Sequence, residues 1–340
     1  MTNKTPIQPL PTQPQSAQPD RTPVERPVDQ AVQPATPQIL FPDDTSSALT
    51  VAEVEVKPES LPEPARSARL IPHSTNRTKV ATTAFVAILQ RDLLVTRREF
   101  ATFLFQMLLQ PLFFLFIFGK VLPQIGIAEQ GFGAVLLPGI VALTIVTTAI
   151  QGVALPLVID LGYAHEIDDR LLAPLPISMV AMEKILFATM RGLIAGAVIF
   201  PLAWIILGDG YQVRSDRVPF LIGIMILTAI AGAALGLTLG TMVQPQQIGL
   251  MFSLIFAPLL FLGCAYYPWG QLDSIRWFQI VTLVNPLTYA SEGLRRSMVP
   301  QTESIPFNTL PAIWVVLGLA STIVAFSLYG IHSFRKRVVS

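Results

Sequence analysis

Six long apolar runs, separated by short polar stretches, follow one another after residue 100. The runs cover about 101–122, 135–159, 185–207, 218–243, 248–267 and 311–331. Each run is long enough to cross the hydrocarbon core of a bilayer as a helix, which takes about 20 apolar residues. We therefore predict an all-α integral membrane protein with six transmembrane helices.

The segment 83–100 has a helical period instead of a continuous apolar run. Val86, Leu89, Leu93 and Phe100 fall on one face, and arginines lie roughly opposite. This pattern is typical of a helix that lies in the membrane interface. We expect an N-terminal interfacial helix that leads into the first span at a bend. The alternative is that the segment extends the first span into water.

The stretch 268–310 mixes tryptophan and tyrosine with aliphatic and charged residues. Part of it, 272–299, is about as long as a span, but charges such as Asp273, Arg276 and Arg296 make crossing costly. Aromatic residues of this kind are typical of the membrane–water boundary. We predict a re-entrant or interfacial helical pair on the outer side and not a seventh span.

The first 72 residues are proline-rich and polar, with too little apolar content to offset the entropy of folding. We expect a disordered Pro-rich cytoplasmic tail at 1–79 and one six-span domain at 80–340. The tail has no apolar core long enough for a secretory signal. Recruitment of a partner's aromatic groove by the tail is the sharper alternative to a solvated tail.

Composition agrees with the pattern of runs. Hydrophobic residues make up 52% of the chain and charged residues 13%, and the mean hydropathy is +0.56, as expected when lipid covers the apolar surface. A net charge of +1 gives no basic face for nucleic acid. Because Cys264 is the single cysteine, a disulfide framework is excluded.

The distribution of basic residues predicts the orientation. An even number of spans puts both termini on one side. Arg97 and Arg98 precede the first span, and Arg335, Lys336 and Arg337 follow the last, so both ends should be cytoplasmic. Arginines between the later spans weaken this bias. We expect a multi-pass protein of the cell inner (plasma) membrane.

With that orientation, the connector 160–184, DLGYAHEIDDRLLAPLPISMVAMEK, lies in the cytoplasm. It is charged, punctuated by prolines and tied at both ends to spanning helices. Any force applied to it reaches those helices directly. It is the candidate contact for a soluble motor.

Ionisable residues are nearly absent from the apolar runs. Arg191 lies in the third run, where a central arginine costs about 3 kcal/mol. We expect it to reach the cytoplasmic surface or to pair with a connector carboxylate, with a direct substrate role as the alternative. Lys120 is close to the outer edge and suits an anchor.

Glycines recur every four residues on two runs. Gly192 and Gly196 lie on the third, and Gly232, Gly236 and Gly240 on the fourth. Small residues at this spacing let helix backbones approach closely in lipid. We predict close helix packing, with a dimer seam along the fourth run as the alternative.

The sequence lacks several catalytic motifs. It has no phosphate-binding loop of the G-x-x-x-x-G-K-[ST] type, no H-E-x-x-H pair and no G-x-S-x-G elbow, and its three histidines are scattered. We therefore expect no enzyme, no metal site, no bound cofactor and no ATP hydrolysis by this chain. Nor does it show the buried carboxylates of an ion-coupled carrier.

Two motifs carry a family resemblance. The connector has Glu166 followed by Asp169-Arg170-Leu171-Leu172-Ala173-Pro174-Leu175-Pro176, and the outer segment reads Asn285-Pro286-Leu287-Thr288-Tyr289 and then Gly293-Leu294-Arg295. Over about 80–335, this arrangement resembles the permeases of type-2 ABC exporters, and the most similar subgroup is the daunorubicin-resistance permeases. The outer motif is the more specific, because the connector has Ile167 and Asp168 where the family usually has Gly-Thr.

The resemblance implies a permease homodimer paired with two copies of a separate ABC ATPase subunit, which would bind ATP and Mg. The exporter would move an amphiphilic or hydrophobic substrate outward. The connector residues expected to contact the ATPase are Glu166, Asp168, Asp169, Arg170, Leu171, Leu172, Pro174 and Pro176.

The outer motif is expected to start a helix at Asn285 and Pro286 that carries Tyr289, Glu292 and Arg295 along one side. It would act as a gate or as a stable outer cap. Two other function classes stay open. A membrane-anchored scaffold that uses the Pro-rich tail would leave the connector unexplained, and an intramembrane enzyme would need a polar site in the bilayer.

Overall fold

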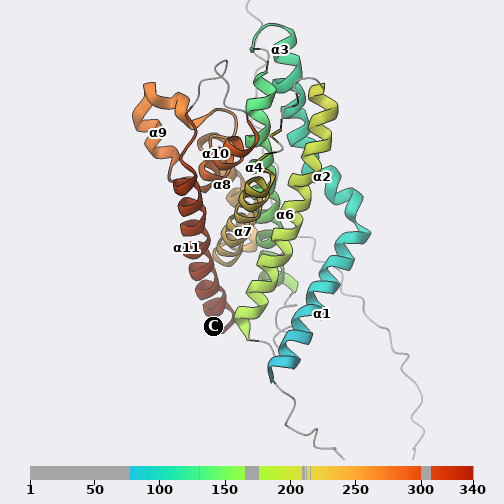
Figure 1. Cartoon of the computed structure of the whole chain (residues 1–340). Helices are drawn as coiled ribbons and strands as arrows, with labels where there is room; N and C mark the ends of the chain where they lie inside the picture. The colour runs from blue at the N-terminus through green and yellow to red at the C-terminus, as the bar shows by residue number, and fades with distance from the viewer. Residues whose placement is uncertain are drawn as a thin grey trace, which may run out of the picture. The chain divides into compact units, whose positions relative to one another are not determined.

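The computed structural model describes residues 77–129, 131–164, 176–208, 211, 213–214, 216–299 and 308–339. All of them belong to one unit of the chain, Leu70–Ser340. These residues form helices and no strand (Figure 1), which confirms the predicted all-α class. The predicted tail, 1–79, lies outside the described residues except for 77–79, which open the first helix.

The described helices follow one another in this order: α1 (Arg77–Arg98), α2 (Phe100–Phe116), η1 (Ile117–Val121), α3 (Leu122–Gln124), α4 (Phe132–Ile159), η2 (Asp160–Ala164), α6 (Ile177–Leu207), α7 (Val218–Met242), η4 (Pro245–Gln247), α8 (Ile248–Leu262), η5 (Trp269–Ile275), α9 (Arg276–Thr282), α10 (Pro286–Met298) and α11 (Ala312–Val339). Of these, η1 and η2 are π-helical, and η4 and η5 are 3₁₀ turns.

Six helices of the described chain are long and apolar enough to cross a membrane, as predicted. They are Phe100–Gln124, Phe132–Gly162, Ser178–Leu207, Val218–Met242, Pro245–Leu262 and Ala312–Arg337. The predicted end of the fifth span, 267, is wrong by five residues. The helix stops at Leu262 because the chain turns at Gly263 and Cys264, where Cys264 has a positive φ of 49°.

The connector is shorter than the predicted 160–184. Residues 160–164 continue from α4 as a π-helix, and α6 already begins at Ile177 after the extended Pro176. Glu183 and Lys184 were predicted in the connector, but both belong to α6 and are buried. The proline explains this early start, because its fixed φ is compatible with the residue that precedes a helix.

Helix α4 is the most deeply buried of the spans and packs against α2, α6, α7 and α10. The glycines of its neighbours face it. A Cβ added to Gly192 would lie 2.9 Å from the Ile145 carbonyl oxygen, and one added to Gly236 would lie 2.7 Å from that of Ile150. Gly196, Gly232 and Gly240 also face α4. These glycines therefore pack against α4 within the chain, and a dimer seam along the fourth run stays an alternative prediction.

Two short helices, α9 and α10, lie between α8 and α11. They have 7 and 13 residues, too few to cross a membrane. Figure 1 shows them near the end of the bundle opposite to the C-terminus. The described part of 268–310 is therefore a helical pair and not a seventh span.

The N-terminal helix α1 bends into α2 at Glu99. Its Phe85 and Ile88 pack toward the bundle with α6 residues. Of the predicted apolar stripe, Val86, Leu93 and Phe100 are exposed. The bend follows the prediction, and the position of α1 in the membrane interface stays a prediction.

Candidate functional site

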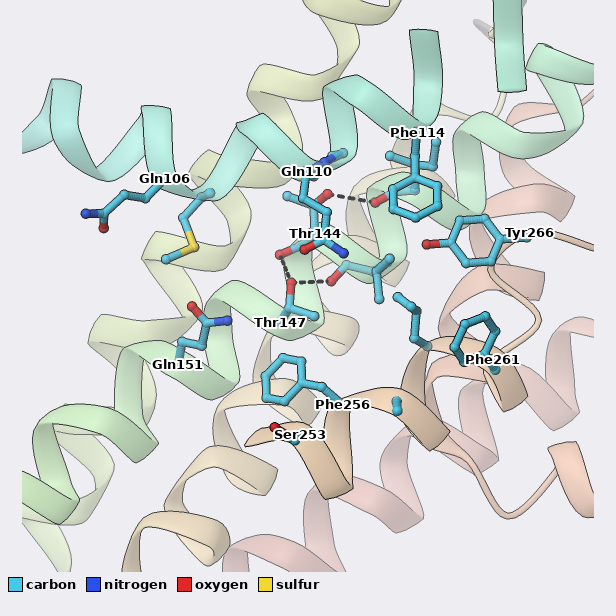
Figure 2. Close-up of a pocket in the computed structure, with 16 residues that line it drawn as sticks. Gln106, Gln110, Phe114, Thr144, Thr147, Gln151, Ser253, Phe256, Phe261 and Tyr266 are labelled. Atoms are coloured by element: carbon cyan, nitrogen blue, oxygen red, sulfur yellow. Dashed lines mark hydrogen bonds between the residues drawn. The ribbon is translucent and has the colours of Figure 1, made fainter. Parts of the chain in front are cut away.

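A cavity of about 330 Å³ lies among α2, α4, α8 and the segment that follows α8. Figure 2 shows its lining side chains. Its polar members are Gln106, Gln110, Thr144, Thr147, Gln151, Ser253 and Tyr266, and its phenylalanines are Phe114, Phe256 and Phe261. None of the 16 described residues that line the cavity is charged.

The threonine and serine hydroxyl groups of the cavity are hydrogen-bonded to their own helices. Thr144 donates to the Ile140 carbonyl and Thr147 to the Leu143 carbonyl, both at 2.8 Å, and Ser253 donates to the Gly249 carbonyl at 3.0 Å. Because the proton of each hydroxyl is used inside the helix, the oxygen is left as an acceptor toward the cavity.

Three glutamines supply both donors and acceptors. Gln106 and Gln110 are one helical turn apart on α2, so they share a face, and Gln151 is contributed by α4. Both α2 glutamines are exposed at the open side of the cavity. A primary amide offers two N–H donors and one carbonyl acceptor, so these side chains equip the cavity for neutral hydrogen bonding.

One end of the cavity is aromatic. The Tyr266 ring stacks on Phe114 with their centroids 5.1 Å apart, and Phe118 lies 6.4 Å from Tyr266. The Tyr266 hydroxyl is buried and has no hydrogen-bond partner in the described residues, and Figure 2 shows it pointing toward the cavity. Burial raises the pKa of Tyr266 to about 12, so the phenol stays neutral and can donate.

The cavity is flanked by exposed apolar surface on the two helices that form its open side. Phe105 and Phe113 on α2 are exposed by 68% and 56%, and Leu250 and Leu254 on α8 by 72% and 73%. The arrangement combines aromatic walls, few polar groups and no charge. It suits a neutral or weakly polar amphiphile.

Near the end of the bundle opposite to the C-terminus, α10 carries a buried charge cluster. Glu292 and Arg295 form an ion pair with both side chains fully buried. Glu292 also accepts from the backbone N–H of Trp269 at 2.9 Å and of Leu310 at 3.3 Å. Arg295 donates to the carbonyls of Val135 at 3.3 Å and Cys264 at 3.0 Å. The cluster therefore joins α10 to α4, to both ends of the α8–η5 link and to the start of α11.

The remaining residues of the outer motif hold the ends of the short helices. Asn285 precedes α10 and accepts from the Leu287 N–H at 3.0 Å, while its amide donates to the Leu259 carbonyl of α8 at 3.0 Å. The Tyr289 hydroxyl donates to the Leu283 carbonyl at 2.8 Å. Pro286 is the first residue of α10. The helix thus starts where the motif predicts.

A family model described as ABC-2 type transporter matches residues 83–299. The chain belongs to the ABC-2 type transporter family. The matched range contains the whole cavity and the short helices α9 and α10. No curated protein matches the chain.

The predicted ATPase-contacting residues of this ABC-2 type transporter fall mostly outside the described residues. They are Glu166, Asp168, Asp169, Arg170, Leu171, Leu172 and Pro174. Pro176 is described and lies exposed directly before α6. The role of the connector therefore stays a prediction.

The cavity itself was missed in the sequence, where only ionisable residues inside the runs were considered. A signal was present. Gln106 and Gln110 interrupt an otherwise apolar run at helical spacing, and Gln151 does so in the next run. Uncharged amides inside spans are strongly polar in lipid and mark a buried or ligand-lined face.

Proposed function

We propose that this ABC-2 type transporter is the permease subunit of an exporter that moves an uncharged amphiphile. The single observation that carries the proposal is the cavity among α2, α4 and α8, with its amides, hydroxyls and aromatic rings and no charge. A substrate with apolar bulk and a few hydrogen-bonding groups would exchange lipid for these rings and amides at little cost.

A second copy of the chain would complete the cavity. Gln106 and Gln110 are exposed in the single chain, although they belong to a helix that is long and apolar enough to span the membrane. Contact with lipid would be costly for these amides. A homodimer that places the exposed α2 and α8 faces of two copies against each other would enclose the glutamines in a shared central pathway.

The energy would come from a separate ABC ATPase subunit. Membrane subunits of this family normally work with such a partner. The connector 165–176 joins η2, which continues the cavity-lining helix α4, to α6, which packs against α4 and α2. Closure of the ATPases around ATP and Mg would therefore displace α4 and α6. This chain would bind neither ATP nor Mg.

Export sets the direction of transport. In a cell inner membrane, with both termini on the cytoplasmic side, the α9–α10 end faces outward. The buried Glu292–Arg295 pair ties that end together through four backbone contacts. These contacts favour a stable outer cap over a gate formed by α10 alone.

A pair of tryptophan substitutions tests the cavity. The full chain is co-expressed with an ABC ATPase, and ATP hydrolysis by the purified complex is measured with a panel of neutral and charged amphiphiles. Ser253→Trp places an indole inside the cavity, so stimulation by the neutral amphiphiles should fall severalfold. Ser321→Trp is the matched control, because Ser321 is also exposed and bonded to its own helix, but lies on α11 away from the cavity.

Co-purification of the ATPase is followed in both variants, so that loss of assembly is not mistaken for loss of substrate binding. Full stimulation of the Ser253→Trp complex would place the transported molecule elsewhere. Preferential stimulation by charged amphiphiles would contradict the uncharged substrate class.

A further inference from the structure

A second, charged crevice of about 240 Å³ lies among α1, α2, α4 and α6. It is separate from the transport cavity, with which it shares no lining residue. Its ionisable lining residues are three basic and three acidic: Arg91, Lys184, Arg191, Asp92, Glu99 and Asp160. This number of charges is exceptional for a chain whose spans are otherwise almost free of them.

Arg191 lines the crevice and has a buried nitrogen without a hydrogen-bond partner in the described part of the chain. Its guanidinium carbon lies 4.4 Å from the centroid of the Phe103 ring and 5.7 Å from that of Phe187. Its Nε is buried without a hydrogen-bond partner, and no ion pair joins Arg191 to a carboxylate within the described residues. The two rings stabilise the cation, and the Glu99 carboxylate interacts with it electrostatically without forming an ion pair.

The position of Arg191 makes this unusual. The residue belongs to the span Ser178–Leu207, where arginine is expensive unless it is paired or reaches a polar boundary. The sequence predicts that Arg191 reaches the cytoplasmic surface or pairs with a connector carboxylate. Asp160 of the predicted connector lines the same crevice as Arg191, but among the described residues no ion pair joins the two. The crevice has room for an anion from outside the chain.

The walls of the crevice are held by an ion pair that uses other residues. Lys184 of α6 donates to Asp92 of α1 at 3.1 Å, with side chains only 7% and 12% exposed. Glu99, at the bend between α1 and α2, also lines the crevice and makes no capping hydrogen bond through its side chain. The crevice thus presents a cation at Arg191 and an anion at Glu99.

An apolar groove of about 550 Å³ adjoins the crevice. It is lined by Leu93, Leu94 and Phe100 of the α1–α2 elbow and by Ile194 of α6. Thr96 lines both the groove and the crevice, so the two meet at this residue. A molecule with a charged head and an apolar chain could therefore occupy both.

We propose that the crevice binds the headgroup of a zwitterionic phospholipid. The phosphate contacts Arg191, whose planar guanidinium matches phosphate geometry. The ammonium group contacts Glu99, and an acyl chain follows the groove past Thr96. This site is independent of the proposed export function, because it needs neither the ATPase nor a transported substrate.

The test is lipid binding to the delipidated full chain in detergent, measured by native mass spectrometry. The probes are phosphatidylethanolamine, phosphatidylglycerol, diacylglycerol and inorganic phosphate. We expect phosphatidylethanolamine to bind most tightly, and diacylglycerol and inorganic phosphate to bind at least about tenfold more weakly, since each lacks part of the recognised group.

The variants separate the two charges of the headgroup. Arg191→Gln should weaken both phospholipids about tenfold, the size of one charge-assisted hydrogen bond. Glu99→Gln should weaken phosphatidylethanolamine and leave phosphatidylglycerol unchanged. Arg335→Gln and Glu129→Gln are the controls, because both residues are exposed and lie outside the crevice.

If Arg191→Gln fails to fold, Phe103→Leu is the second test of the site, because it keeps the arginine and removes one of the two aromatic rings beside it. It should weaken both phospholipids about fivefold. Unchanged phospholipid binding in Arg191→Gln or Phe103→Leu would overturn the site. Equal binding of diacylglycerol and phosphatidylethanolamine would reduce it to an apolar groove, and no effect of Glu99→Gln would remove the ammonium contact.

Discussion

Glu292 and Arg295 stand one helical turn apart on α10 and form an ion pair from which solvent is fully excluded. Each charge has further partners. Two backbone N–H groups donate to the carboxylate, and the guanidinium donates to two carbonyls. These partners come from three segments far apart in the sequence, at Val135, 264–269 and Leu310, so the pair holds together the end of the bundle that carries α10.

Removing one member of this pair should destabilise the protein strongly. Arg295→Met leaves the Glu292 carboxylate buried without its countercharge, which costs about 3–5 kcal/mol. We expect a lower midpoint of thermal unfolding in detergent and a lower yield. The double variant Glu292→Gln, Arg295→Met should recover part of the loss, because no uncompensated charge then remains.

Asp216→Asn is the control for this prediction. Asp216 also pairs with an arginine, Arg214, but it is fully exposed, so its loss should leave the unfolding midpoint nearly unchanged. An Arg295→Met protein as stable as the parent would show that the buried pair does not hold the outer helices.

The glycines of α7 predict a second contrast. Gly236→Ala places a Cβ 2.7 Å from the Ile150 carbonyl oxygen and 2.9 Å from the Ile150 Cα, so the α4 backbone must move. Overpacking of this kind costs about 1–3 kcal/mol. Gly223→Ala on the same helix meets nothing within 4 Å and should be neutral or slightly stabilising. Thermal unfolding of both variants measures the difference, and equal midpoints would contradict the tight α4–α7 contact.

The six spans were predictable because lipid imposes length and apolarity on every helix that crosses it. Their ends were less so. The sequence 263–267 is apolar enough to continue the fifth span, yet Gly263 and Cys264 turn away. A Cβ on Gly263 would lie 2.5 Å from the Leu259 carbonyl oxygen and from Leu287 of α10. This close approach of α10 is a tertiary contact with no local signal.

In the candidate site too, features with a local sequence signal were predictable and features that depend on tertiary contacts were not. Asn285 and Pro286 are local start signals, so the start of α10 could be read from the chain. The partners of Glu292 and Arg295 could not, because Val135 is 160 residues away from Arg295. The cavity likewise needs α2, α4 and α8 to be placed side by side before the spacing of Gln106, Gln110 and Gln151 acquires meaning.

Cys264 should resist thiol reagents in the folded protein. Burial is the main cause that raises the pKa of its thiol to about 11, so at pH 8 only about one molecule in a thousand carries the reactive thiolate. We expect no maleimide labelling between pH 7 and 8, and complete labelling after denaturation in detergent. Glu129→Cys in a Cys264→Ala background is the exposed control and should label rapidly. Rapid labelling of native Cys264 would show that the turn after α8 opens.

The orientation can be tested with single cysteines in the Cys264→Ala background. Ser215→Cys lies between α6 and α7 and Ser304→Cys between α10 and α11, so both should react with a membrane-impermeant thiol reagent on intact cells. Ser178→Cys, at the start of α6, should react only after permeabilisation. The physical reason is the arginine and lysine bias at the two ends of the chain. Labelling of position 178 from outside would reverse the orientation.

The last prediction concerns the connector between η2 and α6. The family resemblance implies that its acidic residues Glu166, Asp168 and Asp169 contact the ATPase. Reversing two of them, in Asp168→Lys with Asp169→Lys, replaces attraction to basic groups of the partner by repulsion. We expect weaker co-purification of the ATPase and lower substrate-stimulated ATP hydrolysis, with membrane insertion retained.

Glu129→Lys with Asp216→Lys is a matched double charge reversal for this experiment. Both residues are exposed, and they lie beyond the ends of α4 and α6 that do not join the connector. It changes net charge by the same amount as the connector variant. If the effect depends on the position of the reversed charges and not on net charge, the control complex should assemble and respond to substrate normally. An equal loss of ATPase co-purification in both variants would indicate a general effect of net charge. Normal co-purification and stimulation in the connector variant would show that 165–176 does not couple ATP hydrolysis to the cavity.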